Sequence, residues 1–234
     1  MKLPQLNTAT YELELPSSGE TVKFRPFLVK EQKILMIAQE SEDEKQIESA
    51  FADIIKECTF GVIEPYSVPL FDVEYIFLQL RGKAVGDKLT LSVLCPDDEE
   101  TRVDINIDLA DVGILMDENH SREIGLTDSI KLVMKYPTLS DMGGFSDKGV
   151  VLSVFEMIKN CIYEIHNGEE IYNAVDVSKK ELDAFIDQMS TKNFDDVNAF
   201  FNTMPKLQHV VKVKNPKTKK TGEVTIEGMQ SFFE

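Results

Sequence analysis

The sequence predicts an α+β protein with a mainly helical core and three peripheral β-hairpins, at residues 9–27, 88–107 and 209–226. Apolar residues recur at helical spacing through most of the 234-residue chain, which is typical of helices packed on a core. Alternation of apolar and polar residues is mostly confined to short runs that come in pairs. Each pair is joined by a polar tip that contains proline, so each pair predicts a hairpin.

The N-terminal half begins with the hairpin at residues 9–27 and continues with helices. Residues 28–40 have helical spacing, and a second helix follows the acidic stretch at residues 40–44. That helix carries an apolar stripe made of Ile47, Ala50, Phe51, Ile54, Ile55 and Cys58. Residues 70–80 are apolar on nearly every side, which predicts a buried helix at the centre of the core.

The C-terminal half alternates between strands and helices. Residues 130–136 predict a strand, and an apolar helix that ends near Ile162 follows it. The Asn167-Gly168 pair predicts the turn of a short hairpin. A capping box at residues 178–181 begins another helix. A last helix carries the apolar residues Phe194, Val197, Phe200, Phe201 and Met204.

Chain length suits one large domain or two small ones. We expect two lobes, an N-terminal lobe at residues 1–118 and a C-terminal lobe at residues 119–234, with a single compact domain as the alternative. Each lobe would contain helices and would carry at least one of the three hairpins.

The charge balance is strongly acidic. Lys and Arg number 25 and Asp and Glu number 41, which gives a formal net charge of −16. This balance disfavours nucleic acid and anionic membranes as partners, because both attract basic surfaces. Solubility is the plainer explanation of the charge, and an acidic face that docks on a basic partner is the other. No apolar run reaches the ~18 residues of a membrane span and no signal peptide begins the chain, so we expect a soluble protein that is not exported by that route.

The cysteines are Cys58, Cys95 and Cys161, and no two of them form a C-x-x-C pair. An odd number of widely spaced cysteines is typical of a reducing compartment. Cys58 and Cys161 lie on helical apolar stripes, so we expect both in the core. Cys95 has no histidine nearby. We therefore expect no bound metal, and we expect Cys95 to react first with a thiol reagent.

The sequence contains no recognisable catalytic motif. Phosphate-binding glycine loops and a nucleophile elbow are absent. The histidines are His120, His166 and His209, and none is spaced as a helical metal ligand. The acidic stretches at 40–44 and 97–100 lack the spacing of a calcium loop. We therefore predict no enzymatic activity, no catalytic residue and no cofactor.

The last hairpin and the C-terminus suggest a partner interface. Lysines cluster there on an otherwise acidic chain, and two aromatic residues follow them. Aromatic anchors beside charge are typical of protein interfaces. The candidate interface residues are Lys206, Lys212, Lys214, Lys217, Lys219, Lys220, Phe232 and Phe233. Two plainer interpretations stay open: the lysines keep an exposed hairpin soluble, and the two phenylalanines fold back under Phe200 and Phe201.

Four sequence blocks, in order along nearly the whole chain, resemble one known family. They are FRPFLVKEQKIL at residues 24–35, FDVEYIFLQLRGKAVG at 71–86, FFNTMPKLQH at 200–209 and the pair Phe232-Phe233. Together they resemble the baseplate hub subunits, or hub assembly proteins, of T-even-type contractile-tailed bacteriophages. The resemblance implies a non-enzymatic structural or assembly subunit of the virion tail baseplate, built in the host cytoplasm.

The resemblance also implies partners, which would be other baseplate, hub or tape-measure proteins. The alternative role is a transient chaperone for hub or tape-measure proteins that is absent from the mature virion. Relatives often carry C-x-x-C pairs at the tips of the hairpins matched here by residues 88–107 and 209–226. In this chain the first tip keeps only Cys95-Pro96 and the second reads Lys214-Asn215-Pro216-Lys217, so a four-ligand zinc site is lost.

Overall fold

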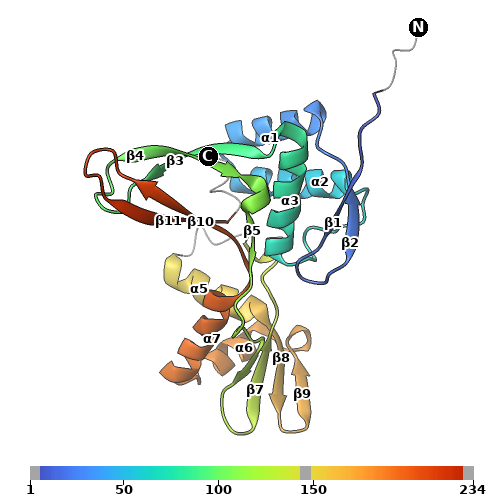
Figure 1. Ribbon diagram of the computed structural model, residues 1–234. Coiled ribbons are helices and arrows are strands. Elements are labelled where there is room, and N and C mark those ends of the chain that lie inside the picture. The colour runs from blue at the N-terminus through green and yellow to red at the C-terminus, as the bar shows by residue number, and fades with distance from the viewer. Residues whose placement is uncertain (1–5, 143–148, 229–234) are drawn as a thin grey trace. The chain divides into compact units, whose positions relative to one another are not determined.

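The computed structural model describes residues 6–142 and 149–228 (Figure 1). Seven α-helices and eleven β-strands lie within these ranges. The contacts divide the chain into a first unit, Met1–Leu115 with Lys206–Glu234, and a second unit, Met116–Pro205. The final hairpin makes this division different from the predicted lobes at 1–118 and 119–234, because its first strand pairs with a strand that ends at Leu115.

The first of two hydrophobic cores in the first unit lies between a hairpin and three helices. The hairpin pairs β1 (Tyr11–Glu14) with β2 (Thr21–Phe24), as the alternation at residues 9–27 predicts. The helices are α1 (Val29–Glu40), α2 (Glu44–Cys58) and α3 (Leu70–Val85). Asp43 begins α2, because its side chain accepts hydrogen bonds from the N–H groups of Lys45 and Gln46.

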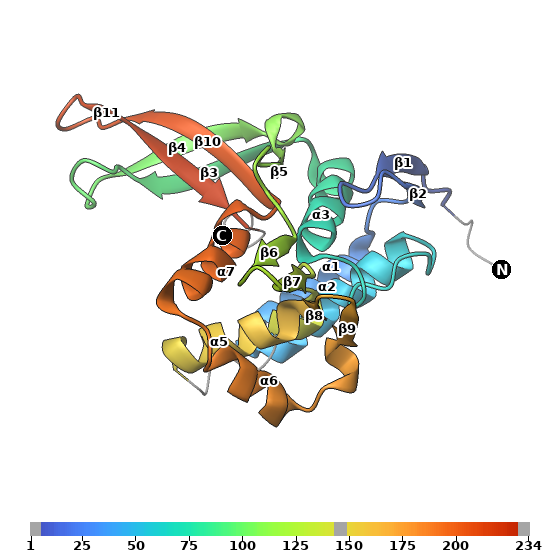
Figure 2. The same ribbon diagram turned by 90° about the horizontal axis from the view of Figure 1, so that it is seen from below.

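A second core in the same unit lies between α3 and two longer hairpins. The strands are β3 (Lys88–Leu94), β4 (Arg102–Asp108), β5 (Gly113–Leu115), β10 (Lys206–Lys214) and β11 (Thr221–Glu227). A 3₁₀ turn at Leu109–Asp111 joins β4 to β5. The β3–β4 pair forms one sheet and the order β11-β10-β5 forms another. Figure 2 shows the two hairpins running together with their tips at the same end.

The second unit places helices against one antiparallel sheet. Its strands are β6 (Glu123–Gly125), β7 (Ile130–Met134), β8 (Ile162–Asn167) and β9 (Glu170–Asn173), in the order β6-β7-β8-β9. Its helices are α4 (Leu139–Met142), α5 (Val150–Cys161), α6 (Lys179–Ile186) and α7 (Thr191–Thr203), with a 3₁₀ turn at Ala174–Asp176. The core lies between the sheet and α5, α6 and α7.

The predicted fold class, a mainly helical core with peripheral hairpins, is wrong. The chain is α+β, but strand residues help to build every core. Phe24 of β2 is 1% exposed, Ile107 of β4 is 2% exposed and Leu132 of β7 is fully buried. The physical reason is the period of two in each strand. It gives each hairpin an apolar face, and that face must be covered by a helix or a second hairpin.

The helices agree with the sequence predictions better than the strands do. Ile76 and Leu80 of α3 are fully buried, and α3 contributes to both cores of the first unit, as the run at 70–80 predicts. Ser178 accepts a hydrogen bond from the N–H of Glu181, which confirms the capping box of α6. Cys58 and Cys161 are fully buried, as predicted.

The lengths and the apolar character of the helices in residues 6–142 and 149–228 bear on membrane insertion. None of the helices there is both long and apolar enough to cross a bilayer.

Candidate partner interface

Six of the predicted interface residues lie on or beside the β10–β11 hairpin. Lys206 pairs with Glu227 across the two strands, with Nζ 3.1 Å from Oε1. Lys212 lies near Glu223 in the same way, at 3.8 Å. Cross-strand ion pairs at an exposed surface contribute less than about 1 kcal/mol. Both lysines therefore contribute weakly to the pairing of the two strands, and their side chains can leave these ion pairs at little cost in free energy.

The other four lysines surround the tip of this hairpin. Lys214, Lys217, Lys219 and Lys220 are all exposed. Among residues 6–142 and 149–228, no carboxylate lies within ion-pair distance of these four ammonium groups. The four ammonium groups at residues 214–220 therefore lie at the surface without a close ion pair, on a chain whose net charge is −16.

The basic tip, residues 215–220, is held by the acidic tip of the β3–β4 hairpin, residues 96–100. The Asn215 amide donates to Asp97 Oδ1 at 2.9 Å and to Asp98 Oδ2 at 2.8 Å. The Thr218 hydroxyl donates to Asp97 Oδ2. We call these four side chains, Asp97, Asp98, Asn215 and Thr218, the tip clasp. Asn215 is only 1% exposed, so the clasp satisfies a buried amide.

The clasp changes the acidity of its carboxyl groups. Hydrogen bonds from Thr218 and then Asn215 hold the pKa of Asp97 below its usual value. Hydrogen bonds from the hydroxyl and N–H of Thr101, together with the Asn215 amide, lower the pKa of Asp98 further. Both carboxylates therefore stay ionised at neutral pH and accept the hydrogen bonds of the basic tip.

The sequence did not predict this contact. Two hairpins with tips of opposite charge were visible in it, and charge complementarity was the available signal. The contact joins residues 117 and 118 positions apart, however, and periodicity carries no information on such pairs. Both interpretations of the lysines in the sequence, a partner surface and an exposed soluble hairpin, leave this contact out.

Cys95, at the base of the acidic tip, is fully buried. All three cysteines are buried, so burial gives Cys95 no advantage over Cys58 and Cys161, and the order in which they react with a thiol reagent stays a prediction. Burial raises the pKa of Cys95, and the charges of Asp98 and Asp97 raise it further. Within the described part of the chain, no three His, Cys, Asp or Glu side chains are grouped as metal ligands.

Phe232 and Phe233 lie outside the described residues. Phe200 and Phe201 belong to the second unit, where their rings meet edge to face at 5.1 Å. Phe200 also stacks on Tyr136 at 5.8 Å and lies 5.2 Å from the ring of His120. The partner role of the two terminal phenylalanines and their packing under Phe200 and Phe201 both stay predictions.

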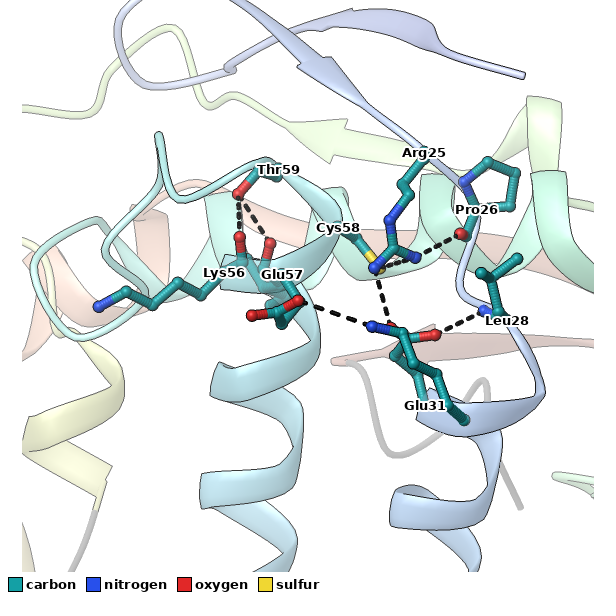
Figure 3. A network of polar contacts seen from close by, with 10 residues as sticks. Arg25, Pro26, Leu28, Glu31, Lys56, Glu57, Cys58 and Thr59 are labelled. Carbon is teal, nitrogen blue, oxygen red and sulfur yellow. Dashed lines mark hydrogen bonds and ion pairs between the residues drawn. The ribbon is translucent and has the colours of Figure 1, made fainter. Parts of the chain in front are cut away.

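A second polar cluster lies in the first unit, where β2 leads into α1 (Figure 3). Glu31, in the first turn of α1, is only 2% exposed. Its Oε1 lies 2.9 Å from Arg25 Nη2, and Lys30 Nζ approaches the same oxygen at 3.1 Å. Its Oε2 accepts a hydrogen bond from the N–H of Leu28 at 2.8 Å. A buried carboxylate with all these partners is well compensated.

Arg25 extends this cluster to the end of α2. Its N–H donates to the carbonyl of Cys58 at 2.9 Å, and its guanidinium donates to the carbonyl of Pro26 at 3.1 Å. We call the residues Arg25, Leu28, Lys30, Glu31 and Cys58 the Arg25 network. It ties β2, α1 and α2 together. The network gives the sequence block at residues 24–35 a structural explanation.

The network also sets two pKa values. Burial alone would raise the pKa of Glu31, but hydrogen bonds from Arg25, Leu28 and Lys30 outweigh it and lower that pKa. Burial would lower the pKa of Arg25, and the bond to Glu31 reverses that effect. Cys58 has a pKa raised to about 11, chiefly by burial, so its thiol stays protonated and unreactive.

The described histidines are engaged in local contacts. His120 Nδ1 lies 2.9 Å from the Thr203 hydroxyl, and His166 Nε2 lies 2.8 Å from a Glu164 oxygen. His209 Nδ1 lies 3.2 Å from the carbonyl of Asp111. These contacts fix side chains within a strand or between neighbouring segments.

The structure thus presents two polar clusters in the first unit: the tip clasp between two hairpins, and the Arg25 network between β2, α1 and α2. The sequence model of the family described as T4 bacteriophage base plate protein matches residues 8–234, so the chain belongs to that family. Comparisons with curated proteins and with solved structures found no match. Membership implies a structural role in the phage tail baseplate, in contact with other baseplate proteins.

Proposed function

We propose that this chain is a structural subunit of the hub of a contractile tail's baseplate, and that it acts through protein contacts without catalysis. The observation that carries the proposal is the family match over residues 8–234, which spans both compact units. The four sequence blocks that resemble hub subunits fall within the same span.

Helix α1 supports a role in assembly. Val29, Met36 and Ile37 are 67%, 53% and 65% exposed. Positions seven and eight residues apart share one face of a helix, so these side chains form an apolar strip on α1. Single exposed apolar residues are ordinary, but a strip of them is typical of a surface that another protein covers.

The basic edge is the second surface that we propose for partner binding. It comprises Lys206, Lys212, Lys214, Lys217, Lys219 and Lys220, with Phe232 and Phe233 following. Its charge suits an acidic protein surface, and charge complementarity would orient the chain as it joins the tail.

Charge reversal tests this edge. We expect the double variant Lys217→Glu/Lys220→Glu to enter tails at least tenfold less often than the wild type. The matched control is Lys179→Glu/Lys180→Glu, which makes the same change at exposed positions of α6 in the second unit. Equal incorporation of the two variants would show that the basic edge does not bind a tail protein.

Deletion of residues 229–234 tests the aromatic part of the edge. If Phe232 and Phe233 are partner anchors, the shortened chain should melt within a few degrees of the wild type and fail to enter tails. A large loss of thermal stability would support their packing under Phe200 and Phe201 instead. Normal stability with normal incorporation would show that these residues bind nothing essential.

The alternative role is a transient chaperone for hub or tape-measure proteins, made and used in the host cytoplasm. Mass spectrometry of purified, finished tails separates the two roles. A hub subunit gives peptides from this chain in every tail preparation. A chaperone gives such peptides only in infected cells and assembly intermediates, and that result would overturn the hub proposal.

A further inference from the structure

The tips of the β3–β4 and β10–β11 hairpins begin with the same turn, although the first tip is one residue longer before its second strand begins. In the first tip the N–H of Glu99 donates to the carbonyl of Cys95 at 2.9 Å, and in the second the N–H of Lys219 donates to that of Asn215 at 2.9 Å. Glu99 and Lys219 both have positive φ, 55° and 66°. A proline follows the first residue of each turn. The two tips are therefore equivalent turns, four residues from carbonyl to N–H.

In each turn one side-chain oxygen accepts backbone N–H groups two and three residues further on, from the first residue of the second turn and from the fourth residue of the first turn. Asn215 Oδ1 accepts from the N–H groups of Lys217 and Thr218, at 2.8 and 3.2 Å. Asp98 Oδ1 accepts from the N–H groups two and three residues further on, at 3.1 and 3.0 Å. Both oxygens thus stabilise the backbone of their own tip.

The equivalent turns also face each other closely. The clasp bonds from Asn215 and Thr218 to Asp97 and Asp98 cross directly between them. The backbone of Gly222 lies against the ring of Pro96, so closely that a Cβ at residue 222 would overlap that ring. The two turns therefore lie in direct contact.

Within each turn, the spacing of two residues matches the spacing of ligand pairs in a zinc site with four ligands. Zinc ribbons place two C-x-x-C pairs on two facing turns. Here the four equivalent positions are 95 and 98 in one turn and 215 and 218 in the other. They hold Cys95, Asp98, Asn215 and Thr218.

These residues do not fit zinc. One thiol is too few for a closed structural site, in which four nitrogen or sulfur ligands are usual. Threonine is not a ligand in such a site, and the oxygens of Asp98 and Asn215 already accept N–H groups and the clasp bonds. The family resemblance implies a metal here, and the side chains present disagree with it.

We propose that the tip clasp is a metal-free replacement of a zinc site. Hydrogen bonds among Asp97, Asp98, Asn215 and Thr218 hold the two turns in the arrangement that a bound metal would impose. The framework of the site persists although three of its four ligand positions lack sulfur. The clasp also covers Cys95, whose thiol stays buried as long as the tips are closed.

The first test uses Cys95 as a reporter of the clasp. Asn215→Asp removes the amide donor and places a third carboxylate against Asp97 and Asp98, so the tips should separate. We expect Cys95 to react with a thiol reagent at least tenfold faster in this variant. Cys58 and Cys161 should keep their wild-type rates, which reports that the rest of the chain is folded.

The matched control is Asn106→Asp, the same change at an exposed position in the body of the β3–β4 hairpin. Cys95 should react there at the wild-type rate. A wild-type rate in Asn215→Asp, or equal acceleration in both variants, would show that the clasp does not hold the tips together.

The second test restores the ligands. The triple variant Asp98→Cys/Asn215→Cys/Thr218→Cys, with the native Cys95, should bind one Co²⁺ per chain, give the intense visible absorption of a tetrahedral thiolate site, and exchange it for Zn²⁺. The wild type should show no such band. A folded triple variant, verified by circular dichroism, that binds no Co²⁺ would overturn the equivalence of the four positions.

Discussion

The Arg25 network and the tip clasp are both clusters of polar side chains, but they connect different parts of the first unit. The network is buried and local: Arg25, Leu28 and Glu31 lie within seven residues, and Glu31 is 2% exposed. The clasp joins residues more than a hundred positions apart, and its Thr218 is exposed. The network fixes how β2, α1 and α2 meet in the core, whereas the clasp fixes how two hairpin tips meet outside it.

Burial decides how much each cluster contributes to stability. Removing one partner of a buried ion pair leaves an uncompensated charge and costs about 3–5 kcal/mol. Removing one hydrogen bond near the surface costs about 1 kcal/mol, because water replaces the lost partner. The comparison therefore teaches that the network should govern the unfolding of the first unit, and that the clasp should govern only the tips.

The largest effect should follow from Glu31→Gln. This variant keeps the shape of the side chain but leaves Arg25 without its anionic partner, so the free energy of unfolding should fall by about 3–5 kcal/mol. Urea denaturation measures it. The control is Glu57→Gln, because Glu57 is exposed and 3.7 Å from Lys30, and its change should stay below about 1 kcal/mol. If the free energy of unfolding fell equally in both variants, burial would not explain the contribution of Glu31 to stability.

A smaller loss should follow from Gly222→Ala. The new methyl group would overlap the Pro96 ring, which cannot turn aside as a flexible side chain can. Overpacking of this kind costs about 1–3 kcal/mol. Gly113→Ala, in β5 of the same sheet, is the control, since a Cβ there meets nothing within 4 Å. Adding Pro96→Ala to Gly222→Ala should recover part of the loss, and a failure to do so would place the strain elsewhere.

The pH dependence of stability should report the ionisation of Glu31 in the network. The folded-state pKa of Glu31 is below its ordinary value of 4.5, so its stabilisation is fully present above pH ~4.5 and is lost as pH falls through the folded pKa. The stability difference between wild type and Glu31→Gln should therefore shrink as the pH is lowered below about 4.5. A difference that stays constant down to pH 3 would contradict the ionised state of Glu31.

The smallest effect should follow from Thr218→Val. It removes one clasp hydroxyl at an exposed site and leaves Asp97 bonded to Asn215, so the free energy of unfolding should change by less than about 1 kcal/mol. Thr218→Ser keeps the hydroxyl and should match the wild type. Urea denaturation combined with amide exchange at residues 215–221 would show whether the change is confined to the tip. Faster exchange throughout the first unit would contradict the view that the clasp stabilises only the tips.

The sequence predicted local structure well where one periodicity dominates. The helices α2 and α3 and the three hairpins lie where apolar spacing places them. The sequence did not predict which elements cover the apolar faces of the hairpins. A strand of alternating residues shows that one face is apolar, but it does not show what packs against that face. The alternation therefore predicts peripheral hairpins, whereas their apolar faces form part of the core.

The candidate site was predictable in part for the same reason. The lysines of the last hairpin could be counted from the sequence, but the contact between Asn215 and Asp98 depends on how two distant hairpins fold together. Cys95 is fully buried, and no local pattern predicts that burial. The order of β11-β10-β5, which returns the end of the chain to the first unit, was hidden because β5 has only three residues.

The most direct test of the account is to titrate the purified protein into an extract of infected cells that lacks it, and to count completed tails. A structural subunit is consumed, so the number of tails should rise in proportion to the protein added and stop at a fixed number of chains per tail. Those chains should be recovered in the tails. If far more tails form than chains were added, or if all added chains stay free in the extract, the protein acts by turnover and the structural account is wrong.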